Sequence, residues 1–422
     1  MHRIGVVGAG YVGLTTAACL ARLGNQVVCA DVDQSRVDAL TRGEVPLHEP
    51  ELDELVADGL STGRLRFVAD NPTAVADAEL VFLCVPTPTG AHGEADLSAV
   101  DAVLREVRTL LAPDCVVVVK STVPAGTVER IRSTVDRQVV SNPEFLREGH
   151  AVHDFLHPSR VVVGADDKAA GRRVADLYAS SGAPVLTTDS ASAELVKYAS
   201  NCFLAMKLSY VNTLAELCER LGADIDDVTD GMGLDDRIGS AFLRPGPGWG
   251  GSCLPKDTRA LLSTADAADV DFPLLRATIT TNDRQAARVV AKIRAALGEP
   301  LAGARIGLLG LTFKAGTDDL RDSPALAIAE LLVAEGAEVT GYDPCVRSPD
   351  RRTGRVRVVD SPYLAAKDAS VLVLSTEWPE FAELDWARLA DEVRDRVVLD
   401  TRGLLSHAGV RPGGFRVHDI GR

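Results

Sequence analysis

Residues 250 to 257 read Gly-Gly-Ser-Cys-Leu-Pro-Lys-Asp and place one cysteine in a glycine-lined turn beside a cation and a carboxylate. A neighbouring positive charge favours the thiolate, and small glycines let a substrate carbon approach the sulfur of Cys253. Lys256 and Asp257 supply the two charges. Most free cysteines, however, are small buried hydrophobes. By itself the segment leaves a nucleophilic and a packing role open.

Two pairs of polar residues at helical spacing are further candidates. Lys197 and Asn201 are four apart in an apolar stretch, so in a helix they share a face and can donate hydrogen bonds to a developing oxyanion. Glu144 and Glu148 have the same spacing and would share a face if their segment were helical. A snorkelling lysine and a solvated pair of glutamates are the alternative readings.

A glycine-rich turn near the N-terminus indicates a dinucleotide site. The run Gly8-Ala-Gly10-Tyr-Val-Gly13 follows an expected strand and opens an expected helix, and Asp31 ends the next strand. The glycines allow a tight turn and a close approach of backbone to pyrophosphate, and the helix N-terminus favours the negative charge. Because Asp31 would repel a 2′-phosphate, we expect NAD in preference to NADP, with Arg36 the one nearby residue that favours NADP. Thr87 and Thr122 also follow strands directly and are candidate cofactor or water ligands.

The elements that must position these residues follow an α/β pattern. Short β-rich runs alternate with helical patterns, and we expect strands at 4–7, 26–30, 80–85, 115–120, 139–141, 160–164, 338–342, 356–359, 371–375 and 397–399, with a second strand-turn-helix pattern opening at residue 305. A stretch without proline or glycine, residues 190–221, predicts one helix of about 45 Å. The predicted fold class is α/β, with two Rossmann-like doubly wound parallel-sheet domains joined by a long central helix.

Bulk properties exclude several classes of protein. The chain has 422 residues, 46% of them hydrophobic and 25% charged, and a net charge of -15, which argues against nucleic acid or an anionic membrane as partner. Eight scattered cysteines show neither zinc-ligand spacing nor a disulfide framework, so we expect no metal and a reducing cytoplasm. The uncharged run 4–21 imitates a signal peptide but lacks a cleavage site.

Taken together, seven motifs resemble the UDP-glucose/GDP-mannose dehydrogenase family along the whole chain. They are Gly-Ala-Gly-Tyr-Val-Gly, Val-Pro-Thr-Pro, Lys-Ser-Thr-Val-Pro, Asn-Pro-Glu-Phe-Leu-Arg-Glu, Glu-Leu-Val-Lys-Tyr-Ala-Ser-Asn, Gly-Gly-Ser-Cys-Leu-Pro-Lys-Asp and Phe-Lys-Ala-Gly-Thr-Asp-Asp-Leu-Arg-Asp-Ser-Pro. The resemblance implies a four-electron oxidation of the C6 hydroxyl of a nucleotide sugar to a carboxylate, with two NAD consumed. Cys253 would form a thiohemiacetal and then a thioester that water hydrolyses.

The resemblance also implies roles for individual residues. Lys197 and Asn201 would hold the oxyanion, Glu144 would be the base for hydrolysis, and Thr122 and Asp257 would orient water or relay a proton. The implied cofactor contacts are Gly8, Gly10, Val12, Gly13, Asp31, Arg36, Thr87, Thr122, Glu148, Lys256 and Arg321. The implied substrate contacts are Glu144, Phe145, Leu146, Arg147, Lys197, Asn201, Arg237, Phe242, Gly250, Lys314 and Arg402. Pro247 stands where family members commonly have an aromatic residue, so the sugar loop is expected to differ locally.

The same resemblance sets the expected domains and partners. Residues 1–189 would bind NAD, residues 190–298 would form a helical dimerisation domain with the cysteine loop, and residues 299–422 would bind the UDP-sugar. We expect a homodimer and UDP-glucose as substrate, with GDP-mannose as the alternative. A nucleotide sensor without activity and a two-electron 3-hydroxyacid dehydrogenase are hypotheses of other classes, which NADH released per sugar would separate.

Overall fold

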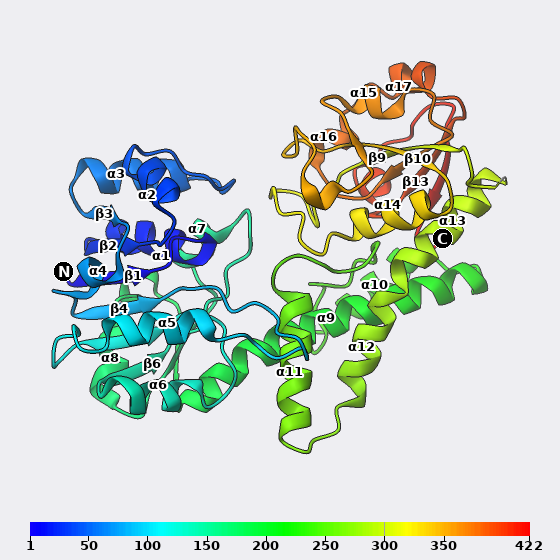
Figure 1. Ribbon diagram of the computed structural model, residues 1–422. Coiled ribbons are helices and arrows are strands. Elements are labelled where there is room, and N and C mark those ends of the chain that lie inside the picture. The colour runs from blue at the N-terminus through cyan, green and yellow to red at the C-terminus, as the bar shows by residue number, and fades with distance from the viewer. Residues whose placement is uncertain (299) are drawn as a thin grey trace. The chain divides into compact units, whose positions relative to one another are not determined.

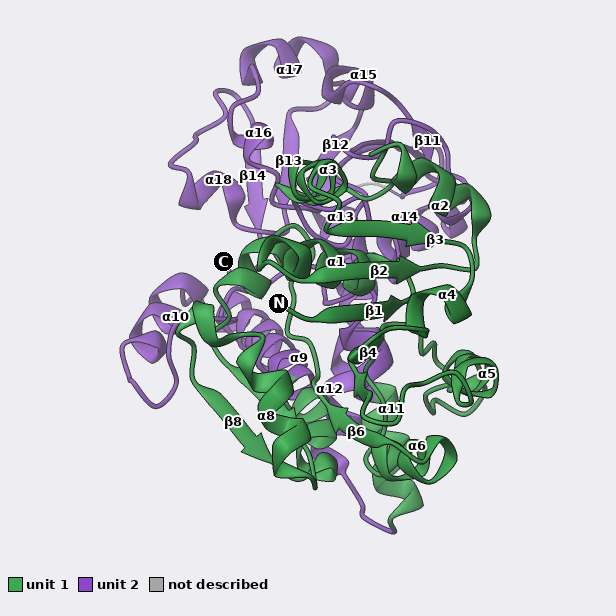
Figure 2. Cartoon of the chain, turned by 90° about the vertical axis from the view of Figure 1, so that its left-hand side faces the viewer, with its two compact units in different colours: residues 1–200, 259–268 green, residues 201–258, 269–422 purple. Residues whose placement is uncertain are grey.

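The computed structural model describes residues 1–298 and 300–422, which form two compact units. The first unit comprises residues 1–200 and 259–268, and the second comprises residues 201–258 and 269–422 (Figure 2). Residue 299, at which the expected third domain begins, lies outside the described residues.

The first unit is built on an eight-stranded sheet with the order β3-β2-β1-β4-β5-β6-β7-β8. Its strands are β1 (Arg3–Val7), β2 (Gln26–Ala30), β3 (Leu65–Val68), β4 (Leu80–Leu83), β5 (Val116–Val119), β6 (Gln138–Ser141), β7 (Val161–Gly164) and β8 (Val185–Thr188). Strands β1 to β6 are parallel and follow the doubly wound order, which confirms the predicted fold class. The pair β6–β7 is antiparallel and β8 runs parallel to β7, so the last two strands reverse direction.

Helices cover both faces of this sheet because both faces of its strands are apolar (Figure 1). One core contains alternate strand residues such as Val6 and Phe82, and the other contains their neighbours Val7 and Val81. The helices are α1 (Tyr11–Arg22), α2 (Gln34–Thr41), α3 (Leu52–Ser61), α4 (Asn71–Val75), α5 (Ser98–Val107), α6 (Thr127–Val135), α7 (Ala151–Leu156) and α8 (Lys168–Asp176).

The predicted long helix exists with its predicted bounds as α9 (Ser190–Leu221). Its first eleven residues belong to the first unit and the remainder belongs to the second. No glycine or proline interrupts it, so its backbone hydrogen bonds run unbroken over 32 residues. Lys197 and Asn201 therefore lie one turn apart on one continuous helix.

The second unit contains a six-stranded parallel sheet with the order β11-β10-β9-β12-β13-β14. Its strands are β9 (Arg305–Leu309), β10 (Glu338–Tyr342), β11 (Arg357–Val358), β12 (Val371–Leu374), β13 (Val397–Asp400) and β14 (Arg416–Asp419). The helices are α10 (Ile225–Gly233), α11 (Leu254–Ala267, shared with the first unit), α12 (Pro273–Asp283), α13 (Gln285–Leu297), α14 (Pro324–Ala334), α15 (Pro362–Ala366), α16 (Pro379–Ala382), α17 (Trp386–Glu392) and α18 (Leu404–His407).

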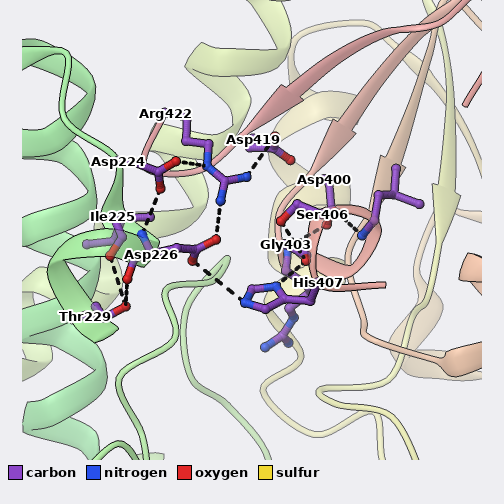
Figure 3. A network of polar contacts seen from close by, with 12 residues as sticks. Asp224, Ile225, Asp226, Thr229, Asp400, Gly403, Ser406, His407, Asp419 and Arg422 are labelled. Carbon is purple, nitrogen blue, oxygen red and sulfur yellow. Dashed lines mark hydrogen bonds and ion pairs between the residues drawn. The ribbon is translucent and has the colours of Figure 1, made fainter. Parts of the chain in front are cut away.

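One apolar core joins the second sheet to the helices of the same unit. Val211 of α9 and Ile225 of α10 belong to the same buried cluster as Leu308 of β9. Polar contacts add to it, because Arg422 contacts Asp224 at 2.8 Å, Asp226, and Asp419 at 3.8 Å (Figure 3). Arg422 thus links the N-terminus of α10 to the last strand, β14.

The two sheets repeat one local arrangement at their first turns. The amide of Ala9 donates to the carboxylate of Asp31 at 2.8 Å, and the amide of Leu311 donates to that of Asp343 at the same distance. In each case a positive-φ glycine, Gly8 or Gly310, ends the first strand, and the acid follows the second. The two predicted Rossmann-like domains therefore share this contact at their first turns.

Some elements differ from the expected pattern. Strands β3, β8 and β14 were not among those predicted, because each has only four residues, includes at least one exposed residue and lacks a continuous apolar run. Residues 142–147 form a loop, so the condition under which Glu144 and Glu148 would share a helical face is not met.

Candidate active site

The glycine turn that ends β1 has the geometry of a phosphate-binding turn. A Cβ on Gly13 would lie 1.8 Å from the carbonyl oxygen of Gly8, whereas a Cβ on Gly10 would meet no atom within 4 Å. Gly10 immediately precedes α1, whose first turn has no side-chain cap and no acidic residue. Gly13 therefore permits helix and strand to pack, and Gly10 leaves open space in front of unpaired amides where a pyrophosphate can approach.

The acid expected to hold the ribose hydroxyls lies at the same edge of the sheet. One carboxylate oxygen of Asp31 accepts the amide of Ala9 and pairs with Arg36 at 3.2 Å. The other accepts the amide of Asp33 at 3.0 Å. The structure thus brings the predicted residues Asp31 and Arg36 into direct contact beside the turn. The positive charge of Arg36 is already neutralised there by the carboxylate of Asp31.

The two threonine loops are also joined in the first unit. The hydroxyl of Thr87 donates to the carbonyl oxygen of Thr122 at 2.8 Å. These loops follow β4 and β5, next to the point where the strand order reverses between β1 and β4. Ligands of doubly wound sheets bind at that switch point, so the contact brings both threonines to the edge expected for the cofactor.

A buried ion pair lies at the end of β6. The carboxylate of Glu144 contacts the ammonium of Lys197 at 2.8 Å, and its second oxygen accepts the amide of Leu146 at 2.6 Å. Burial by itself would raise the pKa of Glu144, but the charge of Lys197 and these hydrogen bonds outweigh it and lower the pKa below its ordinary value. Glu144 is therefore a carboxylate at neutral pH, as a general base must be.

A second buried cation, which the sequence patterns did not single out as a site residue, lies beside this pair. Lys120 donates to the side-chain oxygen of Asn142 at 3.0 Å and to the hydroxyl of Tyr178 at 3.1 Å. Burial lowers the pKa of Lys120 to about 8, and the charge of Lys120 in turn lowers the pKa of Glu144. The sequence contained a signal that could have indicated Lys120 as a site residue, because Lys120 and Asn142 each begin one of the seven motifs directly after a strand.

The remaining predicted residues of the Glu144 loop have defined partners. The Phe145 ring lies 5.4 Å from the ammonium of Lys197 and 3.7 Å from the guanidinium of Arg160. Arg147 is exposed and contacts Asp154 of α7 at 2.6 Å. Phe145 thus helps to fix Lys197, whereas Arg147 anchors the loop to the following helix.

In the second unit, the cysteine loop leads directly into α11. The carbonyl of Cys253 accepts the amide of Asp257 at 2.9 Å, which starts the helix, and the hydroxyl of Ser252 lies 3.5 Å from the sulfur. Cys253 is partly exposed, whereas five of the other seven free cysteines among the described residues, those at 19, 29, 84, 115 and 202, are buried with raised pKa values because of burial. A half-exposed thiol at a helix N-terminus is in the environment that favours a nucleophilic thiolate.

A fully buried carboxylate organises the residues around this turn. Asp257 accepts a hydrogen bond from the side-chain amide of Asn201 at 2.6 Å and pairs with the ammonium of Lys256 at 2.6 Å. These three predicted residues form one connected network within the second unit. The orientation of the Asn201 amide next to the cysteine turn is therefore set by a charged partner.

Close backbone packing explains the glycines that precede Cys253. A Cβ on Gly250 would lie 1.9 Å from the carbonyl oxygen of Asp322, and the amide of Gly251 donates to the carbonyl of Arg321 at 3.0 Å. The cysteine loop therefore rests on the segment that follows β9 and contains Lys314 and Arg321. The side chain of Arg321 itself pairs with Asp319 at 2.7 Å.

The structure brings Arg402 to the same segment. Its backbone amide donates to Asp400, whose carboxylate also accepts the amide of Leu405 and so shapes the turn after β13 (Figure 3). Its guanidinium donates to the carbonyl of Phe313 at 2.9 Å, next to Lys314. Arg402 is thus placed beside another predicted substrate residue, Lys314.

Arg237 and Phe242 lie apart from these groups. Arg237 is almost fully exposed and pairs with Asp235 at 2.6 Å, and Phe242 is also exposed. The described contacts of the loop that contains them lead to Lys207 of α9, which donates to the carbonyls of Ile238 and Ala241. The structure therefore does not join Arg237 and Phe242 to the cysteine turn.

Comparison with known proteins identifies, in three segments along the chain, the same family that the sequence motifs resemble. Residues 2–181 match the NAD binding domain, residues 191–284 the central domain and residues 307–407 the UDP binding domain of the UDP-glucose/GDP-mannose dehydrogenase family. This chain belongs to that family. Its cofactor is accordingly NAD, and the glycine turn at Gly8 to Gly13 lies in the NAD binding domain.

Individual members of the family align over the full length of the chain. UDP-glucose 6-dehydrogenase of Rhizobium meliloti (strain 1021) is 45% identical and covers 100% of this chain and 99% of its own length. UDP-glucose 6-dehydrogenase TuaD of Bacillus subtilis (strain 168) is 40% identical and covers 100% of this chain and 94% of its own. The structure of a UDP-glucose dehydrogenase from Pyrobaculum islandicum superposes with a TM-score of 0.92 at 36% identity, covering 100% of this chain and 98% of that chain.

Two glycine substitutions should separate folding from cofactor binding. Gly13→Ala forces its methyl group onto the Gly8 carbonyl, so we expect a loss of about 1–3 kcal/mol of stability and a lower melting temperature. Gly10→Ala has room in the free protein but places a methyl group where the pyrophosphate approaches, so NAD affinity should fall by roughly tenfold or more while the melting temperature stays close to that of the parent. Thermal unfolding and NAD titration measure both effects. Equal melting temperatures for the two variants would contradict this assignment.

Proposed function

We propose that this protein oxidises the C6 hydroxyl of UDP-glucose to the carboxylate of UDP-glucuronate, with two NAD reduced per sugar. The observation that carries the proposal is full-length similarity to UDP-glucose 6-dehydrogenases, up to 45% identity, with the cysteine turn and the polar residues around it intact. Residues 1–189, 190–298 and 299–422 would serve as the NAD-binding, central and UDP-sugar-binding segments.

In the proposed reaction, NAD held at the turn of Gly8 to Gly13 would supply the hydride acceptor for two successive oxidations of C6. After the first, C6 is an aldehyde carbon, and the Cys253 thiolate adds to it to form a thiohemiacetal whose oxygen carries the negative charge. Loss of the second hydride from the same carbon leaves a thioester. Water then attacks that carbonyl carbon, the carbon–sulfur bond breaks, and the products are the carboxylate and the free thiol.

The contacts of the side chains support their proposed roles. Lys197 and Asn201 lie one turn apart on α9 and would donate to the oxygen on C6, each already oriented by an acid, Glu144 or Asp257. Glu144 would take a proton from the attacking water because its lowered pKa keeps it ionised. Thr122 and Asp257 would orient that water.

The remaining predicted contacts are proposed on their positions in the fold. Lys314 and Arg402 lie in the loops that follow β9 and β13, beside the switch point of the second sheet, where a UDP-sugar is expected to bind. Gly250, Phe145 and Leu146 would line the sugar through backbone and apolar contacts. Glu148, Lys256 and Arg321 would contact the cofactor. Arg237 and Phe242 would frame the nucleotide sugar only after their exposed loop has moved or gained a partner.

Released NADH distinguishes this proposal from the alternatives. Purified protein should release two NADH per UDP-glucose, whereas a 3-hydroxyacid dehydrogenase would release one per substrate and a sensor none. A panel of UDP-glucose, UDP-galactose, GDP-mannose and UDP-N-acetylhexosamines should give the highest kcat/KM with UDP-glucose, and a preference for GDP-mannose would assign the alternative function.

Cys253→Ala should abolish net oxidation and leave NAD affinity within about twofold, because the cysteine lies outside the NAD binding domain. A large loss of NAD affinity in that variant would contradict the role of Cys253.

The proposed base can be tested by trapping the thioester. Glu144→Gln keeps the side-chain shape but removes the group that takes the proton from water, so hydrolysis should slow by about 10²-fold or more and an adduct on Cys253 should accumulate. Intact-mass spectrometry during turnover detects that adduct. Glu330→Gln, at an exposed position on α14, is the matched control and should show none. Unmodified Glu144→Gln protein throughout turnover would count against Glu144 as the base.

We also propose that the protein is a cytoplasmic homodimer that assembles through α9. Phe203, Tyr210 and Leu217 are spaced by seven residues and are 57%, 55% and 49% exposed, so they form an apolar stripe of the kind that pairs helices. All eight cysteines are free, as in a reducing compartment. None of the helices among the described residues has the length and apolar composition of a membrane span.

A charge in the stripe should dissociate the dimer. Tyr210→Lys places an ammonium group in the middle of the proposed interface, and we expect sedimentation velocity to show a shift from dimer to monomer. Leu331→Lys, which introduces the same charge at an exposed leucine of α14, should remain dimeric. An unchanged sedimentation coefficient for Tyr210→Lys would exclude this stripe as the interface.

A further inference from the structure

A buried glutamate outside all the predicted motifs joins two parts of the cofactor domain. Glu49 lies in the loop between α2 and α3 and is only 6% exposed. Its carboxylate accepts the hydroxyl of Tyr11 and the backbone amides of Gly149 and Ala151, the amides at 2.7 Å each. Tyr11 is 38 residues from Glu49 in sequence, and Gly149 and Ala151 are 100 and 102 residues from it, so Glu49 connects segments that are distant along the chain.

One of these segments is the NAD turn. Tyr11 is the first residue of α1 and follows Gly10 directly, inside the run Gly8 to Gly13. Burial, together with Glu49 and the charge of Glu148, raises the pKa of Tyr11, so its hydroxyl is protonated and donates to Glu49. The amide of Gly149 also donates to the Tyr11 hydroxyl, at 2.9 Å. Tyr11, Glu49 and Gly149 therefore form a closed set of contacts.

The other segment ends the loop that contains Glu144 and Glu148. Gly149 follows Glu148, and Ala151 begins α7, whose preceding residue His150 provides no side-chain cap. Glu49 supplies the missing acceptor for these amides, and its negative charge suits a helix N-terminus. Asp154 of α7 holds the loop again through Arg147. The loop is thus fixed at one end by Lys197 and at the other by Glu49 and α7.

We propose that Glu49 is a positioning residue that couples the NAD turn to the Glu144 loop. It contacts neither reacting atoms nor cofactor phosphates in this proposal and acts through Tyr11 and the amides of Gly149 and Ala151. The inference rests on the proposed function, because it assumes that NAD at the turn and Glu144 serve one reaction.

The test is a double-mutant cycle of Glu49→Gln and Tyr11→Phe. Glutamine has one acceptor oxygen, and its NH2 group would face amide donors, so one of the contacts must break. Tyr11→Phe removes the link to the turn but leaves the contacts of Glu49 with the amides of Gly149 and Ala151. Glu54→Gln, at an exposed position on the neighbouring helix α3, is the matched control. The readouts are NAD dissociation constants without sugar, KM for NAD, kcat at saturating substrates and the melting temperature.

If Glu49 couples the two segments, Glu49→Gln should weaken NAD binding and lower kcat by about tenfold each, since small misplacements of reacting groups are costly. Tyr11→Phe should weaken NAD binding by about threefold or more, and the double variant should be no worse than Glu49→Gln alone within about twofold, because both changes break one link. The control should match the parent.

Three results would overturn the proposal. They are parent-like NAD binding and kcat in Tyr11→Phe, fully additive effects in the double variant, or a Glu49→Gln variant that lowers only the melting temperature. If Glu49→Gln does not fold, the values for Tyr11→Phe decide the question. NAD binding without sugar reports on the coupling separately from the reaction, and the parent's release of two NADH per UDP-glucose tests the proposed function itself.

Discussion

A charged side chain buried away from water needs an ionic or hydrogen-bonding partner to be stable. The candidate catalytic residues of this protein lie where buried charges have such partners. Glu144 is buried against Lys197, Asp257 against Asn201 and Lys256, and Glu49 against a tyrosine and two amides. In each case the contact also fixes the orientation of the side chains that take part in it. The networks that make burial of these groups tolerable therefore orient the groups that the proposed reaction uses.

Parallel sheets explain why the partners come from distant parts of the chain. Every parallel strand delivers its following loop to the same edge, so the turns after β1, β4 and β5 meet at one switch point and those after β9, β12 and β13 meet at another. The hydrogen bond from Thr87 to Thr122 and that from Arg402 to Phe313 are consequences of this rule. The long helix α9 adds a rigid element that carries Lys197 and Asn201 one turn apart.

The glycines of the first turn and Cys253 show what a local sequence pattern can predict and what it cannot. The roles of Gly8, Gly10 and Gly13 follow from the strand, turn and helix around them, and the structure gives each a distinct steric environment. The sequence also placed Cys253 in a glycine-lined turn, but the approach of Gly250 to the Asp322 carbonyl joins residues more than 70 positions apart. Such a contact leaves no periodic signal. The same holds for Glu49, which only its burial distinguishes from the exposed acids near it in sequence, such as Glu44 and Glu51.

Sequence alone therefore determined the α/β class, the glycine turn after the first strand, the bounds of α9 and the family, because these depend on periodicity, glycine placement and motifs that are local in the chain. Tertiary structure decided that residues 142–147 form a loop, that β7 and β8 reverse direction, and that Glu144 meets Lys197 while Glu49 meets Tyr11. Those outcomes depend on which segments are packed together once apolar faces are buried, and the partner of a buried charge is known only when its neighbours in space are known.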